Sequence, residues 1–242
     1  MTNMKIMKVK DINQKHETKK NILSSLPMRT LIIGKSALSG KTNLLVNLLC
    51  QENKEFYKDD FKGENIWLVS ASIGTDDKLN KLIEFKEIPE QNLLFSFDEQ
   101  KLEKIYDEIT ERFNTAIEEK IKVPNYLIIL DDISFSGDLK KRQNGILSKM
   151  MSNGRHINLS VIMTAQKYSD IFTAGRENMT QLFCFACSNK QMDLIGMDVN
   201  VLSTNEFNKI FRKSTEIKHN FFGVNFFKNS NEMYFNSDFE TI

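Results

Sequence analysis

The amino-acid sequence predicts an α/β domain with a central, mostly parallel β-sheet and helices on both faces. Three observations support this fold class. Short apolar runs of strand length recur along the chain and alternate with segments that have the apolar spacing of helices. Within residues 28–49, one such run leads through a glycine turn directly into a helix. Residues 221–235 hold two apolar runs around a polar turn, which predicts a C-terminal antiparallel hairpin at the sheet edge.

Length and composition fit one large domain. The chain has 242 residues, of which 40% are hydrophobic and 27% are charged, and its formal net charge is +1. We expect a polar, lysine-rich N-terminal arm at residues 1–27, either a solvated leader or a contact to DNA or a partner, followed by a single domain at residues 28–242. The net charge neither supports nor excludes a nucleic-acid partner. Three cysteines and the absence of a long apolar run indicate an intracellular protein with no secretion signal or transmembrane span.

Residues 28–49 have the form of a phosphate-binding P-loop, with a hydrophobic strand before the turn and a helix after it. Gly40, Lys41 and Thr42 supply the end of the motif: glycine lets the backbone approach a phosphate, lysine reaches the β- and γ-phosphates, and threonine binds Mg²⁺. The amide groups at the start of the helix also face the anion. The predicted nucleotide-binding residues are Gly34, Lys35, Ser36, Ala37, Leu38, Ser39, Gly40, Lys41, Thr42 and Asn43.

This loop departs from the usual spacing at one point. Five residues separate Gly34 from Gly40, one more than the motif has between its glycines, and Lys35 occupies the position of the first glycine. The loop is therefore either one residue longer or lacks that glycine. The alternative to nucleotide binding is a strand-to-helix turn that binds nothing.

Four elements are expected before the next motif. Residues 66–70 form an apolar run suited to a buried parallel strand, residues 76–85 have helical character, and residues 92–97 resemble another strand. Asp98 is placed to cap a long helix with one apolar stripe, which predicts packing against the core and not a cofactor site. The stripe consists of Leu102, Ile105, Ile109, Phe113 and Ile117.

Residues 126–132 form an aliphatic run that ends in two carboxylates, Asp131 and Asp132. A buried strand that ends in acid is where a P-loop enzyme keeps its Walker B site. Asp131 would hold Mg²⁺ through water, opposite Thr42, and Asp132 would polarise the attacking water as general base. The cation would offset the repulsion between the two carboxylates. The alternative is an acidic turn at the end of a strand.

A helix at residues 138–153, with Gly154 as its candidate C-cap, precedes a strand at residues 159–163. Gln166, at the end of that strand, is positioned to contact the γ-phosphate or the attacking water as a sensor. Arg155 precedes the same strand and therefore lies at its opposite end, too far from its own nucleotide. It would either reach the active site of a neighbouring subunit as an arginine finger or cap the helix.

The remaining candidate motif is a pair of cysteines, Cys184 and Cys187. Residues 182–186 resemble a strand, in which residues three apart point to opposite faces, and the chain has no second cysteine pair. We therefore expect structural thiols and no metal site. The three histidines are scattered along the chain, so a histidine metal site is not expected either. The aromatic residues of the C-terminal hairpin are expected to pack at the sheet edge and not to stack on bases.

Four segments, GKSALSGKT, LIILDD, GRH and SVIMTAQ, occur in an order that resembles the packaging ATPases of the FtsK/HerA superfamily, specifically the poxvirus-type branch of large DNA viruses and virophages. The resemblance extends from Arg29 to near Phe235. Arg176 with Asn178 resembles a second arginine–asparagine feature of this branch. By this resemblance, Lys41 and Thr42 match Walker A, Asp131 and Asp132 match Walker B, Gln166 matches the sensor, and Arg155 matches the arginine before the sensor strand.

The residues alone indicate Mg²⁺-dependent ATP hydrolysis by an additional-strand P-loop domain. The resemblance implies more: a ring-forming ATPase, pentameric or hexameric, that drives double-stranded viral DNA into a preformed capsid. Its partners would be DNA and the capsid or portal vertex, and its location would be the host cytoplasm at the virus factory, and the virion. The alternatives are a related DNA helicase or conjugative-type DNA pump, and a nucleotide-binding capsid or membrane adaptor without turnover.

Overall fold

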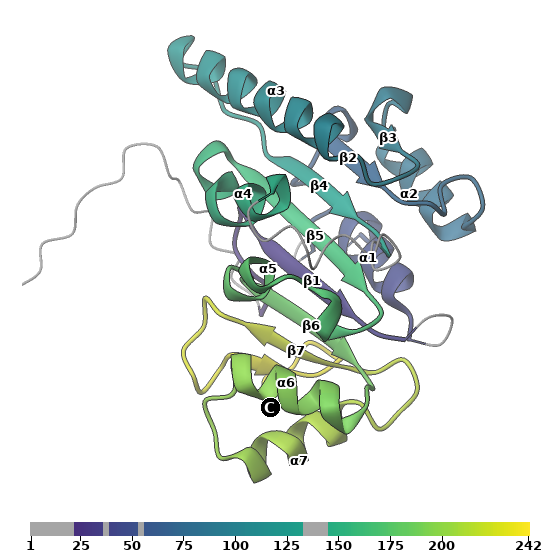
Figure 1. Cartoon of the computed structure of the whole chain (residues 1–242), viewed down its shortest axis with the longest axis vertical. Helices are drawn as coiled ribbons and strands as arrows, with labels where there is room; N and C mark the ends of the chain where they lie inside the picture. Colours follow the sequence, from purple (N-terminus) through teal and green to yellow (C-terminus); the bar gives the residue numbers. More distant parts are fainter. Residues whose placement is uncertain (1–21, 36–38, 53–55, 133–144) are drawn as a thin grey trace, which may run out of the picture.

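The computed structural model describes residues 22–35, 39–52, 56–132 and 145–242, which form one eight-stranded sheet (Figure 1). Strands β3, β2, β4, β5, β1 and β6 run parallel in that spatial order, and β7 and β8 continue the sheet in antiparallel orientation. The predicted fold class and the C-terminal antiparallel strands are confirmed. The strands are β1 (Arg29–Ile33), β2 (Ile66–Val69), β3 (Leu93–Leu94), β4 (Tyr126–Leu130), β5 (Leu159–Ala165), β6 (Gln181–Phe185), β7 (Phe221–Asn225) and β8 (Tyr234–Phe235).

Strand β5 lies between β1 and β4 and pairs with both. The register places Ile33 of β1 beside Ala165 of β5, and Leu130 of β4 beside Met163. The carboxyl ends of these three strands therefore lie side by side. The P-loop follows β1 and the paired carboxylates follow β4, so the additional strand separates the two motifs and places its own C-terminal residues between them.

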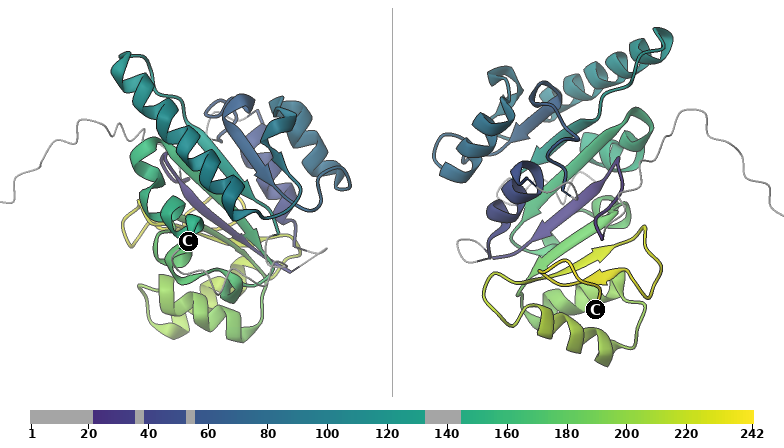
Figure 2. Two further views of the ribbon diagram at one scale, coloured as in Figure 1. Left: turned by 45° about the horizontal axis from the view of Figure 1, so that its top comes forward. Right: turned by 180° about the vertical axis from the view of Figure 1, so that it is seen from behind.

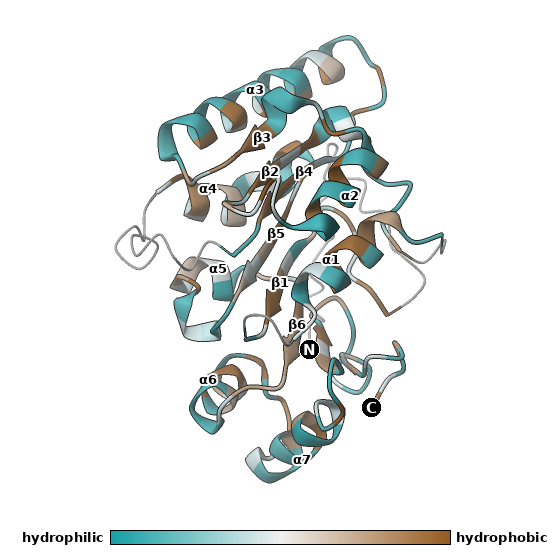
Figure 3. Ribbon diagram, turned by 90° about the vertical axis from the view of Figure 1, so that its right-hand side faces the viewer, coloured by the Kyte–Doolittle hydropathy of each residue, from teal (hydrophilic) through white to brown (hydrophobic). Residues whose placement is uncertain are grey.

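Helices cover both faces of the sheet (Figure 2). Leucines of α1 and α2 pack with one set of strand side chains, such as Ile32, while the other helices pack with the alternate set, such as Leu31. The strands are brown and the outer helix faces mostly teal in Figure 3, as expected for a sheet buried on both sides. The helices are α1 (Lys41–Cys50), α2 (Asp77–Lys86), α3 (Glu99–Glu118), α4 (Ile146–Asn153), α5 (Thr173–Glu177), α6 (Asn189–Val199) and α7 (Thr204–Ser214).

Two predicted elements differ in detail from the structure. Strand β3 is only two residues long, because Phe95, which the prediction included, is 61% exposed and leaves the sheet. In α3, Asp98 accepts a hydrogen bond from the backbone amide of Lys101, as predicted for an N-cap, and the first four stripe residues are buried. Ile117 is 42% exposed, because the C-terminal end of α3 projects beyond the sheet (Figure 1).

The chain between β6 and β7 forms two helices that the sequence analysis did not anticipate. Ser203 and Glu206 make a reciprocal capping box at the start of α7. Phe207 and Phe211 of this helix pack on Phe222 of β7, with ring centroids 5.5 and 5.2 Å apart. This aromatic contact fixes the pair α6–α7 against the antiparallel end of the sheet.

The structure describes only the last residues, 22–27, of the predicted N-terminal arm. Leu23 and Leu26 are buried, and Tyr57 donates a hydrogen bond from its hydroxyl to the carbonyl oxygen of Ser24, 2.8 Å away.

The helix predicted at residues 138–153 corresponds to α4 from Ile146 onward, and residues 138–144 lie outside the described residues. In the described part of the chain, no helix has the length and hydropathy needed to cross a membrane.

Candidate functional site

The P-loop residues that the structure describes close tightly at the carboxyl end of β1. Gly40 has φ 96°, a left-handed conformation that glycine adopts without cost, and α1 begins at Lys41. The Nζ of Lys41 donates to the carbonyl oxygen of Gly34 at 2.8 Å. A side chain on Gly34 would place its Cβ 2.6 Å from Cβ of Ser39, so this position has room for glycine alone. Ser36, Ala37 and Leu38 lie outside the described residues, and the extra length of the loop stays a prediction.

Lys41 is almost fully buried, at 8% exposure. Burial lowers the pKa of its ammonium group, and the nearby carboxylates of Asp132 and Asp131 oppose that shift. The lysine and the two acids are therefore close enough to interact electrostatically, although they come from opposite sides of β5. The register of β1, β5 and β4 likewise places the ends of the strands that carry the two motifs beside each other.

Asp131 is a buried carboxylate held by two hydroxyl groups. The Oγ1 of Thr164 donates to its Oδ1 at 2.7 Å, and the Oγ of Ser70 donates to its Oδ2 at 3.2 Å. Burial raises the pKa of Asp131, while both hydrogen bonds favour the ionised form. A buried carboxylate with no salt bridge in the described residues is well suited to receive a cation.

Ser70 and Thr164 were not identified as site residues from the sequence. Ser70 directly follows the apolar strand β2, and Thr164 is the second-last residue of β5, so the two residues lie on either side of β4. That pattern was visible, but it becomes informative only when the strand order is known. Thr164 has a further contact, because its Oγ1 accepts a hydrogen bond from the backbone amide of Asp132 at 2.9 Å.

Asp132 and Gln166 are in direct contact. The Nε2 of Gln166 donates to the two carboxylate oxygens of Asp132, at 3.3 and 3.2 Å. Asp132 has φ 47°, a left-handed conformation that aspartate adopts more readily than most residues. The carboxylate predicted as general base and the amide predicted as sensor thus form one unit at the ends of β4 and β5.

The two side chains predicted to bind Mg²⁺ both offer oxygen ligands. Thr42 is the second residue of α1, and Asp131 follows β4. No group of three or more histidine, cysteine, aspartate or glutamate side chains gathers into a metal site in the residues the structure describes. Few protein oxygens beside a phosphate loop fit Mg²⁺, which keeps waters and phosphate oxygens as its other ligands.

Arg155 lies at the opposite end of the sheet from these residues. It belongs to a short 3-10 turn before β5, whereas Gln166 follows β5, and seven strand residues between them span roughly 23 Å. The guanidinium is exposed and its Nε donates to Nε2 of His156 at 3.3 Å. Burial and the charge of Arg155 lower the pKa of Arg29 to about 10, so two cations share this end of the sheet.

Arg176 lies away from the carboxyl edge and holds helices together. Its Nη1 bonds to Oδ2 of Asp198 on α6 at 2.8 Å, and its guanidinium lies over the ring of Tyr168, 5.5 Å from the centroid. The hydroxyl of Tyr168 donates to the same carboxylate oxygen at 2.9 Å. Asn178 bonds to the carbonyl oxygen of Ala174 within the same turn. The arginine–asparagine feature therefore joins α5 to α6.

Arg176→Met is expected to lower the free energy of unfolding by about 1–3 kcal/mol, since the partly buried Asp198 loses its charged partner. ATP binding should be unchanged because the pair lies outside the nucleotide edge. Urea denaturation and calorimetric titration with ATP measure the two effects. Arg212→Met on the exposed face of α7 is the matched control. Loss of ATP binding with unchanged stability would contradict this structural role.

The side chains of Cys184 and Cys187 lie close together, although the sequence analysis expected them on opposite faces of a strand. Strand β6 ends at Phe185, so Cys187 belongs to the turn after it and the alternation of a strand does not separate it from Cys184. Burial and the neighbouring Cys187 raise the pKa of Cys184, while Cys184 and the charge of Lys35 lower the pKa of Cys187. Both thiols are free. No group of three or more possible metal ligands includes them in the described residues, and their role as structural thiols stays a prediction.

Solved structures of similar fold come from viral and bacterial ATPases. The genome packaging NTPase B204 of Sulfolobus turreted icosahedral virus 2, in complex with AMPPCP, has a TM-score of 0.55 at 12% identity, covering 86% of this chain and 96% of that one. The DNA-packaging ATPase B204 of Sulfolobus Turreted Icosahedral Virus gives 0.54 at 13% identity, over 87% and 97%. The cytoplasmic domain of the Type VII secretion ATPase EccC of Thermomonospora curvata gives 0.53 at 11% identity, over 82% and 22%. At these identities the likeness establishes the fold.

Sequence comparison identifies the family. A search of curated proteins gave no match. The family described as "Poxvirus A32 protein" matches residues 15–222, which is most of the chain and includes every motif discussed above. Together with the P-loop fold and its structural neighbours, this match shows that the chain belongs to the Poxvirus A32 protein family.

Proposed function

We propose that this protein is an ATP-driven motor that translocates double-stranded viral DNA into a preformed capsid. The observation that carries the proposal is the meeting of Lys41, Asp131 and the Asp132–Gln166 pair at the carboxyl ends of β1, β4 and β5. This arrangement contains the parts needed to hold a triphosphate and to position a water molecule beside it. The likeness to packaging NTPases, one of them in complex with the ATP analogue AMPPCP, supports the choice of substrate.

In this mechanism, the ammonium of Lys41 neutralises charge on the β- and γ-phosphates. Thr42 and Asp131 hold Mg²⁺, which offsets phosphate charge when bound. Asp132 accepts a proton from water as the oxygen attacks the γ-phosphorus, and ADP leaves with the electrons of the cleaved bond. Gln166 orients both the carboxylate and the water, since its amide already contacts Asp132.

The same proposal includes a homo-oligomeric ring, pentameric or hexameric, in which Arg155 serves the nucleotide of a neighbour. Its other partners would be double-stranded DNA and the capsid or portal vertex, in the host cytoplasm at the virus factory and in the virion. The fold likeness to a secretion ATPase keeps a related DNA pump or helicase as the second candidate. Strand-unwinding activity would distinguish a helicase from a packaging motor.

Steady-state ATP hydrolysis by the purified protein, with and without linear double-stranded DNA, tests the proposal. Turnover that rises with DNA and vanishes in Lys41→Ala is the expected result, because the variant lacks the cation that binds the phosphates. Turnover that is independent of DNA would contradict the motor function. Nucleotide binding with no turnover under either condition would favour an adaptor that only binds nucleotide.

A further inference from the structure

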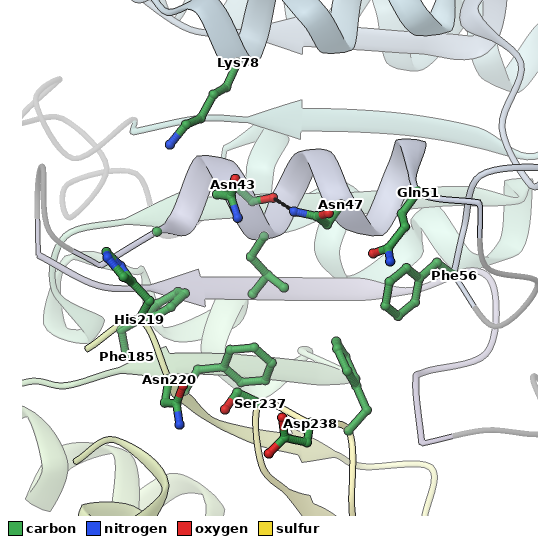
Figure 4. A pocket seen from close by; sticks show the side chains of 14 residues that line it. Asn43, Asn47, Gln51, Phe56, Lys78, Phe185, His219, Asn220, Ser237 and Asp238 are labelled. Atoms are coloured by element: carbon green, nitrogen blue, oxygen red, sulfur yellow. Dashed lines mark hydrogen bonds between the residues drawn. The ribbon is translucent and has the colours of Figure 1, made fainter. Parts of the chain in front are cut away.

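A cavity of about 570 Å³ lies along α1, between this helix and the C-terminal part of the chain (Figure 4). Gly40, Asn43 and Asn47 line it from the P-loop and the helix. His219 and the segment 237–239 line it from the opposite side. None of these C-terminal residues belongs to a sequence motif, although they face the best-defined motif of the chain.

The cavity is continuous with the phosphate loop. Gly40 and Asn43 belong both to the predicted phosphate-binding residues and to the cavity lining. A Cβ on Gly40 would lie 3.6 Å from Nδ1 of His219, so the imidazole sits against the loop glycine. A nucleotide whose phosphates bind at the start of α1 therefore has open space for its nucleoside beside His219.

Two residues of the C-terminal wall have unusual backbone conformations. His219 has φ 73° and Phe239 has φ 60°, in the left-handed region that is costly for residues other than glycine. The segment around Phe239 is held by Asn236, whose Oδ1 accepts from the amides of Asp238 and Glu240, each at 3.0 Å. Such conformations persist where surrounding contacts fix them, and they concentrate at functional sites.

The wall combines aromatic rings with polar groups that are not used elsewhere. Phe221 and Phe239 pack edge to face with ring centroids 5.7 Å apart. The side chains of Asn220, Ser237 and Asp238 line the same cavity and make no hydrogen bond to the described part of the chain. Apolar walls with a few convergent polar groups are characteristic of small-molecule sites.

We infer that this cavity is the nucleoside subsite of the motor and that the C-terminal segment selects the base. The inference rests on the proposed nucleotide binding at the P-loop. His219 lies beside the first turn of α1 and Asp238 lies opposite the middle of the helix (Figure 4). The ribose, which follows the phosphates, meets His219, and the base lies farther along and meets Ser237 and Asp238. A carboxylate only accepts hydrogen bonds when ionised, so Asp238 selects a base with an exocyclic amine, as in adenine.

Calorimetric titration of the full-length protein with two Mg²⁺-loaded probes, ATP and inorganic tripolyphosphate, tests this subsite. His219→Gly removes the imidazole and suits the left-handed backbone, so the fold should be retained. Asp238→Asn removes the acceptor charge with little change in size. Each variant should bind ATP about tenfold more weakly, the effect of losing one good polar contact, and should bind tripolyphosphate like the wild type. Asp193→Asn, on the exposed face of α6, is the matched control.

Purine riboside triphosphate, which lacks the exocyclic amine, tests the base contact directly. The wild type should prefer ATP to this analogue, whereas Asp238→Asn should bind the two equally. Unchanged ATP binding in both variants, or equal losses for ATP and tripolyphosphate, would overturn the subsite. Wild-type protein that binds neither probe would instead overturn the proposed function, and this inference with it.

Discussion

Asp132→Asn is expected to lower kcat for ATP hydrolysis by about 10²–10⁴-fold while ATP binding is retained. Asparagine has nearly the same shape as aspartate, and its amide can still pair with Gln166, but it cannot accept the proton of the attacking water. It also tolerates the left-handed backbone at this position, where φ is 47°. The defect should therefore be chemical and not structural.

Steady-state kinetics and calorimetric titration with MgATP separate these effects. Asp193→Asn makes the same change on the exposed face of α6 and should leave kcat unchanged. Asp132→Ala is a poorer test, because alanine at a positive φ adds backbone strain to the loss of the carboxylate. A kcat within twofold of the wild type in Asp132→Asn would exclude Asp132 as the general base.

The strongest local patterns of residues predicted the correct elements. The strand, turn and helix at β1 and α1 follow each other directly, and the aliphatic run of β4 ends in paired acids, so each motif contains its own structural context. A buried parallel strand is nearly uniformly apolar, which makes these runs easy to recognise. The placement of Gln166 and Arg155 at opposite ends of β5 followed from strand geometry alone.

Contacts between strands were harder to foresee. Ser70 and Thr164 bond to Asp131 only because β2 and β5 flank β4, and a single sequence does not give that order. The exposure of Ile117 depends on how far α3 extends beyond the sheet, which its apolar stripe does not encode. By contrast, the capping box of Ser203 and Glu206 is a local sequence pattern from which the start of α7 could have been predicted.

The C-terminal wall of the cavity illustrates the same limit on a larger scale. Residues 221–235 gave the correct antiparallel strands, but their role depends on contact with a helix near the start of the chain. His219 belongs to no recognisable sequence pattern. Its features of interest are its positive φ and its position against Gly40, and neither can be seen in the sequence. Long-range placement of this kind becomes visible only in the folded chain.

Arg155→Ala is expected to lower kcat by on the order of 10³-fold or more under conditions where the proposed ring forms. The guanidinium is exposed, lies at the amino end of β5, and shares its surroundings with the cation of Arg29. No salt bridge to Arg155 occurs in the described residues, and two neighbouring cations favour an anionic partner from outside the subunit. A phosphate held by the next subunit would supply that anion. Arg212→Ala, on α7, is the matched control.

Mixing two inactive variants distinguishes action between subunits from action within one. Arg155→Ala keeps its own nucleotide site, and Asp132→Asn keeps its arginine. In a ring with repeated head-to-tail interfaces, an equal mixture should recover roughly a quarter of wild-type hydrolysis, because one interface in about four joins the two intact halves. No such pairing restores activity if Arg155 acts on its own nucleotide or only stabilises the turn before β5. Absence of recovery in mixed rings of confirmed composition would therefore reject the arginine finger, and normal hydrolysis by Arg155→Ala alone would reject it more directly.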